Sequence, residues 1–456
     1  MGVDAIHGDL EYRLPEYEMI DDIIAGERAV KEAGERYLPA LKGQTNSDYS
    51  SYKSRGKFFN ATGRTLQGLM GGLFRKPVDV KLPPSVDALR SSIMSTGQDD
   101  LTLYRKVATS ILKYGRAGLL VDSLEKNSPY IALYKPQHIT NWRTEFIDGR
   151  EVLTLLVLQE TIEEPKADDP FKLVCVGSFR VFRLLENQVE VTVWKADEDG
   201  NYIQIDEKFP KIKGRALDRI PFIFIGADSN TSEVNKPPLL DMAYVNINHW
   251  RLSVDYNHGL HFCALPTPWR AGFDSSEEQV GIGPLQLWEA SDYNAKCGYL
   301  EFTGQGLVSV SKAMSEDKED MAVLGARIIE QTRSRVETAE AARIRQSGES
   351  GTLIGISNNI SDGLTEAMKL VARWIGASEE LYVKLSTDFV DSKMEPQEIT
   401  ALLSTLQSGS ISLDTFLWNL QQGELLPPDR DIEDEKLKIE AEGNRSFTSG
   451  NMGNTE

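Results

Sequence analysis

The sequence predicts an α+β fold, for three reasons. Its 456 residues are 40% hydrophobic and 26% charged, the composition of an ordinary folded protein, which excludes wholesale disorder or a fibre. Apolar residues recur at helical intervals in the first 117 residues and again after residue 237. Between these regions lie four β-branched and aromatic runs that are typical of strands: 152–158, 171–176, 189–194 and 220–225.

The first 76 residues are predicted to be mostly helical. One amphipathic segment starts at Met19, and a second carries Tyr52, Leu66 and Leu73 at helical spacing before Pro77 ends it. The opposite face of the second segment is basic, with Lys53, Arg55, Lys57 and Arg64. This face is either solvated or a contact with an acidic neighbour. A further helix is expected over 98–117.

The central region predicts two helices around a small insert. Helical patterns cover 237–264 and 311–331, and the segment between them, 265–310, holds six Gly and three Pro. Short apolar runs within that segment indicate a small β-rich module. An antiparallel helix pair with this module at its tip would connect the three parts.

The residues after 331 are predicted to form a polar exposed segment, then several helices, and then a disordered tail. Residues 332–351 lack large apolar side chains apart from Val336 and Ile344, so an exposed segment is expected. A helix with a regular apolar stripe follows it: Leu353, Ile356, Ile360, Leu364, Ala367, Val371 and Trp374. Shorter helices are expected over 396–407 and 411–420. The final residues, 443–456, have a composition typical of disorder.

Charge and cysteine usage restrict the class of protein. Fifty basic and 69 acidic residues give a net charge of −19, which argues against tight wrapping of nucleic acid. Cys175, Cys263 and Cys297 form no CxxC, so we expect no disulfide framework and a reducing compartment. No signal peptide, myristoylation motif or membrane-spanning run is evident, and a soluble intracellular chain is expected, without membrane contact.

Motifs for catalysis are missing from the sequence. It holds no GxxxxGK[ST] phosphate loop, no GxSxG elbow and no HExxH metal motif. The acidic run at 197–200 lacks the pattern of a calcium loop and predicts a turn. One cluster has metal-ligand chemistry, namely Asp255, His258, His261 and Cys263, although polar positions on a packed helix explain it as well. We therefore expect no enzyme and no cofactor.

Several segments together resemble the portal proteins, or head-to-tail connectors, of tailed double-stranded DNA bacteriophages. The similar segments are 130–134 with 139–143, 239–244 with His249 and Trp250, 266–269, 337–343 and 409–412. None is a sharp motif, so the order of the parts carries more weight. The resemblance implies a wing (1–236), a stem (237–264 and 311–331), a clip (265–310), a tunnel loop (332–351), a long wing helix (352–391) and a helical crown (392–442), before the tail 443–456.

The resemblance also implies an assembly and its partners. Portal subunits form a ring, usually a dodecamer, at one capsid vertex of the virion, and assemble in the host cytoplasm. Double-stranded DNA passes through the central channel during packaging and ejection. The ring meets the major capsid protein, and the clip binds first the terminase large subunit, which hydrolyses ATP, and then adaptor or head–tail connector proteins.

Two groups of candidate site residues follow from the resemblance. Trp269, Phe273 and Trp288 lie in the clip, where they are shared with a neighbouring clip or form a self-contained core. Arg333, Arg335, Arg343 and Arg345 lie in the tunnel loop, where they contact DNA or pair with glutamates of the adjacent subunit. The alternatives are another virion structural protein, such as a minor capsid or adaptor component, and a metal-dependent hydrolase built on His258 and His261.

Overall fold

The computed structural model confirms a mixed α+β fold. It describes residues 2–123, 128–166, 169–197, 199–264, 267–273, 289–290, 292–300, 304–329, 339–387, 389, 396–422, 425–426 and 430–439. The chain divides into two compact units, Met1–Asp388 and Phe389–Glu456. The three cysteines are free.

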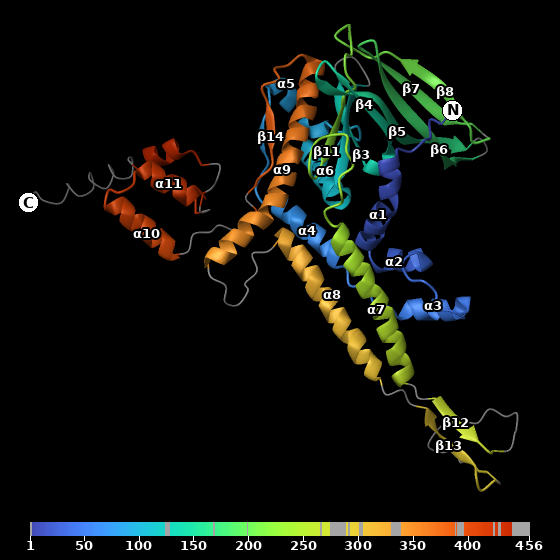
Figure 1. The fold of residues 1–456 in the computed structure, drawn as a ribbon. Helices are drawn as coiled ribbons and strands as arrows, with labels where there is room; N and C mark the ends of the chain where they lie inside the picture. The colour runs from blue at the N-terminus through green and yellow to red at the C-terminus, as the bar shows by residue number, and fades with distance from the viewer. Residues whose placement is uncertain are drawn as a thin grey trace, which may run out of the picture. The chain divides into compact units, whose positions relative to one another are not determined.

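The first unit begins with a group of helices, as the apolar spacing predicts (Figure 1). Their bounds are α1 (Gly8–Ala25), α2 (Glu27–Ala33), η1 (Gly34–Arg36), α3 (Asn46–Arg55), α4 (Ala61–Leu73), α5 (Pro84–Asp87), η2 (Arg90–Ser92) and α6 (Asp100–Tyr114). Local chemistry sets several of these ends. Thr45 and Asp48 form a reciprocal capping box at the start of α3, and Gly115, with φ of 74°, ends α6 in the left-handed region.

A three-stranded antiparallel sheet forms the centre of this unit, in the order β11–β2–β3. Its strands are β2 (Arg116–Ser123), β3 (Pro129–Tyr134) and β11 (Phe222–Gly226). The middle strand is buried on both faces, because the consecutive residues Leu119, Leu120 and Val121 are all at 0% exposure. A short helix η3 (Pro136–His138) leads out of this sheet.

A second antiparallel sheet has the order β4–β5–β6–β7–β8. Its strands are β4 (Ile139–Ile147), β5 (Arg150–Lys166), β6 (Asp169–Leu185), β7 (Gln188–Ala196) and β8 (Tyr202–Lys208). The expected strands at 152–158 and 171–176 are too short, because β5 and β6 each run for 17 residues. A small hairpin follows, β9 (Lys211–Ile212) with β10 (Arg215–Ala216).

Beyond the two sheets, a helical hairpin extends from the unit (Figure 1). It consists of α7 (Leu240–Ala264) and α8 (Gln305–Ile329), with β12 (Thr267–Ala271) and β13 (Lys296–Leu300) at its far end. The expected helix at 311–331 therefore starts six residues late. Gln305 to Val310 continue the same helix because nothing in that stretch breaks it.

The long helix α9 (Ala339–Ile375) carries the expected apolar stripe, and all seven stripe residues are buried. Gly363 lets α9 lie directly on β11, since a Cβ there would be 2.5 Å from Ile225 Cγ1. Two expectations are wrong at its ends. Residues 339–351 of the expected tunnel loop are helical, because alanine and other strong helix formers fill 339–346. The helix does not reach 391, because Gly376 (φ 69°) ends it and β14 (Tyr382–Lys384) then pairs with β1 (Asp79–Lys81).

The second unit is helical where it is described. It holds α10 (Pro396–Gln407) and α11 (Leu413–Gln422), and residues 432–439 are also helical. The sequence prediction for 396–407 is confirmed, and that for 411–420 is two residues early. Ser412 sets the start of α11, because its hydroxyl accepts a hydrogen bond from the Thr415 N–H at 3.2 Å.

Candidate functional site: the α7–α8 hairpin and its tip

The helices α7 and α8 pack in antiparallel register along their whole length. Met242 faces Gly325, Asn248 faces Asp317, and Gly259 faces Leu307, so partner numbers fall on α8 as they rise on α7. The closest approach is at Gly259, where a Cβ would be 2.6 Å from Leu307 Cδ2. Each helix has 25 residues, about 37 Å at ~1.5 Å per residue.

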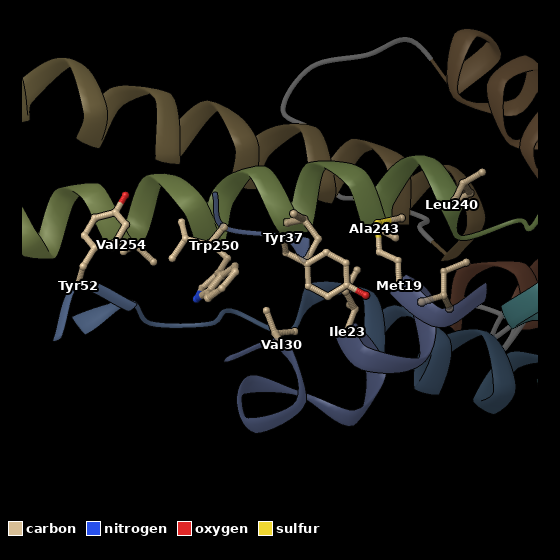
Figure 2. Close-up of a cluster of buried hydrophobic side chains, with 12 residues drawn as sticks. Met19, Ile23, Val30, Tyr37, Tyr52, Leu240, Ala243, Trp250 and Val254 are labelled. Carbon is tan, nitrogen blue, oxygen red and sulfur yellow. The ribbon is translucent and has the colours of Figure 1, made fainter. Parts of the chain in front are cut away.

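The proximal half of α7 is anchored in a buried apolar cluster (Figure 2). Trp250, at 0% exposure, lies at its centre among side chains from the N-terminal helices. The cluster comprises Met19, Ile20, Ile23, Val30, Tyr37, Leu38, Tyr52, Leu240, Ala243, Ile247, Trp250 and Val254. The helix is thereby fixed to the body of the first unit.

Buried hydrogen bonds fix the same half of α7 in one register. The Asn246 side chain accepts from the backbone N–H of Thr62 at 3.1 Å and from its hydroxyl at 2.9 Å. Its amide donates to the Phe59 carbonyl at 2.8 Å. Ser253 likewise accepts from the Lys57 N–H at 3.0 Å. Sliding α7 by one turn would leave these groups unsatisfied, which opposes such a shift.

The distal half of α7 and the tip present apolar side chains to solvent. Within residues 255–264 none is buried, in contrast to nine buried residues between Leu240 and Val254. The exposed apolar residues of this region are Leu260, Phe262, Trp269, Tyr293, Tyr299, Leu300 and Val308. A group of exposed apolar residues of this size on one part of a protein is typical of an interaction surface.

Two of the three expected clip residues lie among the described residues of the tip. Trp269 lies on β12, 43% exposed, with its indole against Gly298 of β13. Phe273 is half-buried, and the Arg270 guanidinium lies 5.8 Å from its ring centre. Trp288 lies outside the described residues. A sharing of these rings between subunits stays a prediction.

Opposite charges lie on two sides of α8, and the basic side includes residues of the segment around α4 that packs against it. On the basic flank (Lys57, Arg64, Lys318), the Arg64 and Lys318 cations lie 5.5 and 5.6 Å from the same Phe59 ring. None of these three cations has an ion pair with a described carboxylate. The acidic flank is Glu316, Asp317 and Asp320, and two of these lie about 160° round α8 from Lys318.

Burial and these charges shift two titratable groups between the helices. His249 is 3% exposed, and neither ring nitrogen has a hydrogen-bond partner among the described residues. Burial, and then the Lys318 ammonium, lower the pKa of His249. Burial raises the pKa of Asp317, and the nearby Asp320 and Glu316 carboxylates act in the same direction against the Asn248 hydrogen bond.

The residues with metal-ligand chemistry, Asp255 and His258 among them, have other partners in the structure. Asp255 accepts a hydrogen bond from the Tyr52 hydroxyl, and His258 Nδ1 lies 3.5 Å from the Arg55 guanidinium. The His258 ring also packs edge-on against Tyr52 and Phe262. In the part of the chain that the structure describes, no three His, Cys, Asp or Glu side chains converge as metal ligands. Asp197 closes a turn, as predicted, by accepting from the Asp199 and Asn201 N–H groups.

The structure describes only part of the expected tunnel loop with its four arginines. Arg333 and Arg335 lie outside the described residues. Arg343 and Arg345 belong to the first turns of α9, so their backbone is helical. The role of these arginines toward DNA stays a prediction.

The flank contacts could not be predicted from the sequence. The sequence pattern identifies the basic residues near 53–64, but not that Lys318 joins Arg64 at Phe59. For the packing of α7 on α8, by contrast, the sequence holds a usable signal in Gly259 and Gly325, because glycine inside a long helix often marks close packing.

The described helices include none that is both long and apolar enough to span a membrane.

Comparison with protein families gives one match. The family described as a domain of unknown function, DUF4055, matches residues 238–375, which run from the start of the hairpin to the end of α9. The comparison with curated proteins found no match.

Comparison with solved structures finds chains of phage-like particles. A chain of the virion of a native gene transfer agent particle is 14% identical, with TM-score 0.36, covering 84% of this chain and 94% of that one. A chain of the neck of the native particle, computed with C12 symmetry, is 12% identical with TM-score 0.40, covering 85% and 98%. A neck chain of the empty particle, computed with C6 symmetry, is 14% identical with TM-score 0.39, covering 82% and 92%.

Proposed function

We propose that this chain is a portal subunit, which forms a ring at one vertex of a tailed-phage capsid. The observation that carries the proposal is the hairpin, which is anchored at its base by Trp250 and exposes apolar residues at its tip. In a ring, such a hairpin is the stem and its tip is the clip. The wing and crown would be the sheets with α9 and the second unit, respectively.

The two flanks of the hairpin support a ring rather than a two-fold dimer. A basic flank (Lys57, Arg64, Lys318) and an acidic flank (Glu316, Asp317, Asp320) on one subunit allow each copy to meet a different surface of the next. Head-to-tail contacts of this kind generate a closed ring when the rotations from each copy to the next add up to a full turn. The exposed tip residues would then be covered by neighbouring tips and by docked partners.

The net charge suits a conduit for double-stranded DNA. Twelve copies at −19 each would carry a formal charge of −228 (12 × 19). A channel of that sign repels phosphates, of which duplex DNA carries one per ~1.7 Å, so that DNA does not adhere as it moves. Salt screens this repulsion beyond about 8 Å, which confines the effect to the channel wall.

The proposed partners and location follow from this role. The clip would bind the terminase large subunit during packaging and adaptor or head–tail connector proteins afterwards, while the wing contacts the major capsid protein. The chain itself would catalyse no reaction and need no cofactor, since terminase hydrolyses the ATP. It would assemble in the host cytoplasm and remain in the virion.

The arginines near the start of α9 have a proposed role in the same channel. Arg333, Arg335, Arg343 and Arg345 would contact phosphates transiently, because guanidinium groups bind phosphate in a strongly acidic surrounding only briefly. Replacing all four by Gln should leave ring assembly intact and shorten or destabilise the packaged DNA. Normal packaging and retention of a full genome by this variant would remove the DNA-contact role.

Electron microscopy of the purified protein, with light scattering, tests the proposal. We expect a closed ring with an axial hole and a mass of about 610 kDa, twelve times 50.9 kDa. The contrary result is a monomer, or an open or two-fold assembly, across a wide range of salt and protein concentration. Binding of terminase to the ring, and its loss when 270–303 is replaced by a short linker, tests the clip assignment separately.

A further inference from the structure

A basic-rimmed hollow lies on one face of the five-stranded sheet. Its volume is about 1120 Å³, within the range of sites that hold a ligand or a protein segment. Phe182 and Val191 of the sheet form its floor together with Leu217 and Pro221. Lys211 and Lys213 of the β9–β10 hairpin line its rim. The lining also holds two ion pairs, Arg180 with Asp122 and Lys208 with Asp206. The floor is therefore apolar, and the excess charge of the rim comes from the β9–β10 hairpin.

The rim concentrates positive charge in a chain that is strongly acidic. Lys211, Lys213, Arg215 and Arg219 occur within nine residues, against the single acid Asp218. None of the four has an ion pair with a carboxylate in the described ranges. A two-residue turn at Lys213 (φ 50°) and Gly214 (φ 82°) holds this basic hairpin.

An adjoining hollow of about 520 Å³ extends the basic surface. It is lined by Arg215, Arg219 and Arg373, and it shares Trp374 with the larger hollow. Trp374 is 8% exposed, and its indole N–H is buried with no hydrogen-bond partner among the described residues. Burial and the neighbouring Arg373 cation lower the pKa of Arg219. Glu379 pairs with Arg373 at 3.1 Å, so Arg215 and Arg219, beside the unused indole donor, are the cations of this hollow that remain for an anionic group.

The matching feature is a two-stranded ribbon at the other end of the same sheet. Pairing of β4 with β5 ends at Leu158, and pairing of β7 with β6 ends at Ser178. Among the described residues, 159–166 and 169–177 therefore pair only with each other. On this ribbon Phe171 is 96% exposed and Leu173 58% exposed. Its sequence between 163 and 169 has four acids and one lysine.

The ribbon and the hollow of one chain cannot meet. Phe182, in the hollow, and Phe171, on the ribbon, belong to the same strand β6. Eleven residues of extended chain separate them by about 36 Å at ~3.3 Å per residue. A strand cannot fold back on itself over that length while its ladder is intact. A second copy can supply the ribbon that the hollow fits.

We propose that the β5–β6 ribbon of each copy docks in the hollow of the next copy, with apolar side chains on the floor and carboxylates at the rim. The inference rests on the proposed ring and names a contact within it. The contact joins two different surfaces, so it propagates from copy to copy and closes only as a ring. A DNA duplex is a poorer fit, because an apolar floor gives nothing to phosphates.

Charge reversal with complementation tests this docking. The rim variant is Lys211→Glu with Lys213→Glu and Arg215→Glu, and the ribbon variant is Glu163→Lys with Glu164→Lys and Asp169→Lys. Each alone places like charges on both sides of the contact, and we expect at least a tenfold fall in the fraction of chains in rings. An equimolar mixture of the two restores opposite charges at every contact, and should restore rings of even copy number.

A matched control reverses three exposed lysines elsewhere. Lys42→Glu with Lys81→Glu and Lys384→Glu changes the net charge by the same amount as the rim variant and should leave ring assembly unchanged. Circular dichroism and thermal unfolding confirm that each variant is folded. Phe171→Ser changes a fully exposed side chain without affecting the fold, and we expect it to weaken ring closure, with Phe171→Leu restoring it.

The outcomes separate this contact from the proposed function. Rings from both reversal variants and from Phe171→Ser at the wild-type level would overturn the docking and leave the portal proposal standing. Absence of rings from the wild-type protein would overturn both. Intact rings, with binding of inorganic phosphate or duplex DNA lost only in the rim variant, would make the hollow an anion site and overturn the docking.

Discussion

The two halves of α7 have opposite surroundings although they form one continuous helix. From Leu240 to Val254 the helix is held by a buried cluster and by the hydrogen bonds of Asn246. From Asp255 to Ala264 no side chain is buried, and Leu260 and Phe262 face solvent. Stability of the monomer should therefore reside in the proximal half, and association in the distal half and tip.

The largest difference is expected between two tryptophans. Trp250→Ala removes the largest side chain of the proximal cluster, and should lower the free energy of unfolding by about 3–5 kcal/mol. Trp269→Ala, at the tip, should cost less than about 1 kcal/mol in the monomer, because that ring is 43% exposed. Chemical denaturation of both variants measures the contrast. Equal losses of stability would show that the tip belongs to the folding core.

A smaller difference is expected between two asparagines on α7. Asn246→Ala leaves the Thr62 N–H and hydroxyl and the Phe59 carbonyl without partners, at a cost of about 1–3 kcal/mol. Asn257→Ala removes only a bond to the Ser253 carbonyl one turn earlier, and should change the unfolding free energy by less than about 0.5 kcal/mol. Urea midpoints give both values. A large effect at Asn257 would contradict the division of α7.

Two glycines should respond in opposite directions. A Cβ at Gly259 would be 2.6 Å from Leu307, so Gly259→Ala should destabilise the hairpin by about 1 kcal/mol as Leu307 shifts. A Cβ at Gly306 would meet nothing within 4 Å, and Gly306→Ala should stabilise α8 by about 0.5–1 kcal/mol. Thermal unfolding of the two variants distinguishes them. Stabilisation by both would mean that α7 and α8 are not in close contact there.

The smallest expected effect is a pH dependence from His249. Its pKa is lowered in the folded chain, so below about pH 6.5 the unfolded chain binds more protons, and the free energy of unfolding decreases as the pH is lowered. His249→Phe should flatten the decline of the unfolding free energy between pH 7.5 and 5. His258→Phe should flatten it less, because His258 is less buried. An unchanged slope in His249→Phe would show that protonation there costs nothing.

The regular elements could be predicted from the sequence where side-chain periodicity runs for several turns. The stripe from Leu353 to Trp374 has seven positions, and every one is buried. The strands at 152–158 and 171–176 were predicted too short, because Pro165 and a run of charged residues interrupt the apolar pattern while the ladder continues. Residues 339–351 have helix propensity without an apolar stripe, and so gave no periodic signal.

The elements of the candidate site could be predicted from the sequence, but the contacts between them could not. The spacing of two helices around a small module predicted the hairpin and placed Trp269 and Phe273 at its tip. The charged flanks depend on Phe59 meeting Lys318, and the hollow depends on the β9–β10 hairpin meeting the face of the sheet. Such contacts join segments far apart in the chain, and no local pattern encodes them.

The contacts between α7 and the N-terminal helices also set a minimum delay in folding during translation. Thr62 and Asn246 are 184 residues apart, and Tyr52 and Asp255 are 203 apart. At ~5–20 residues per second, the ribosome needs about 10–40 s to make α7 after the helices that it covers. The parts of α1 and α3 that α7 covers therefore stay exposed while 184 to 203 of the 456 residues are made. The nascent chain should bind chaperones during this interval and release them once Trp250 has been made.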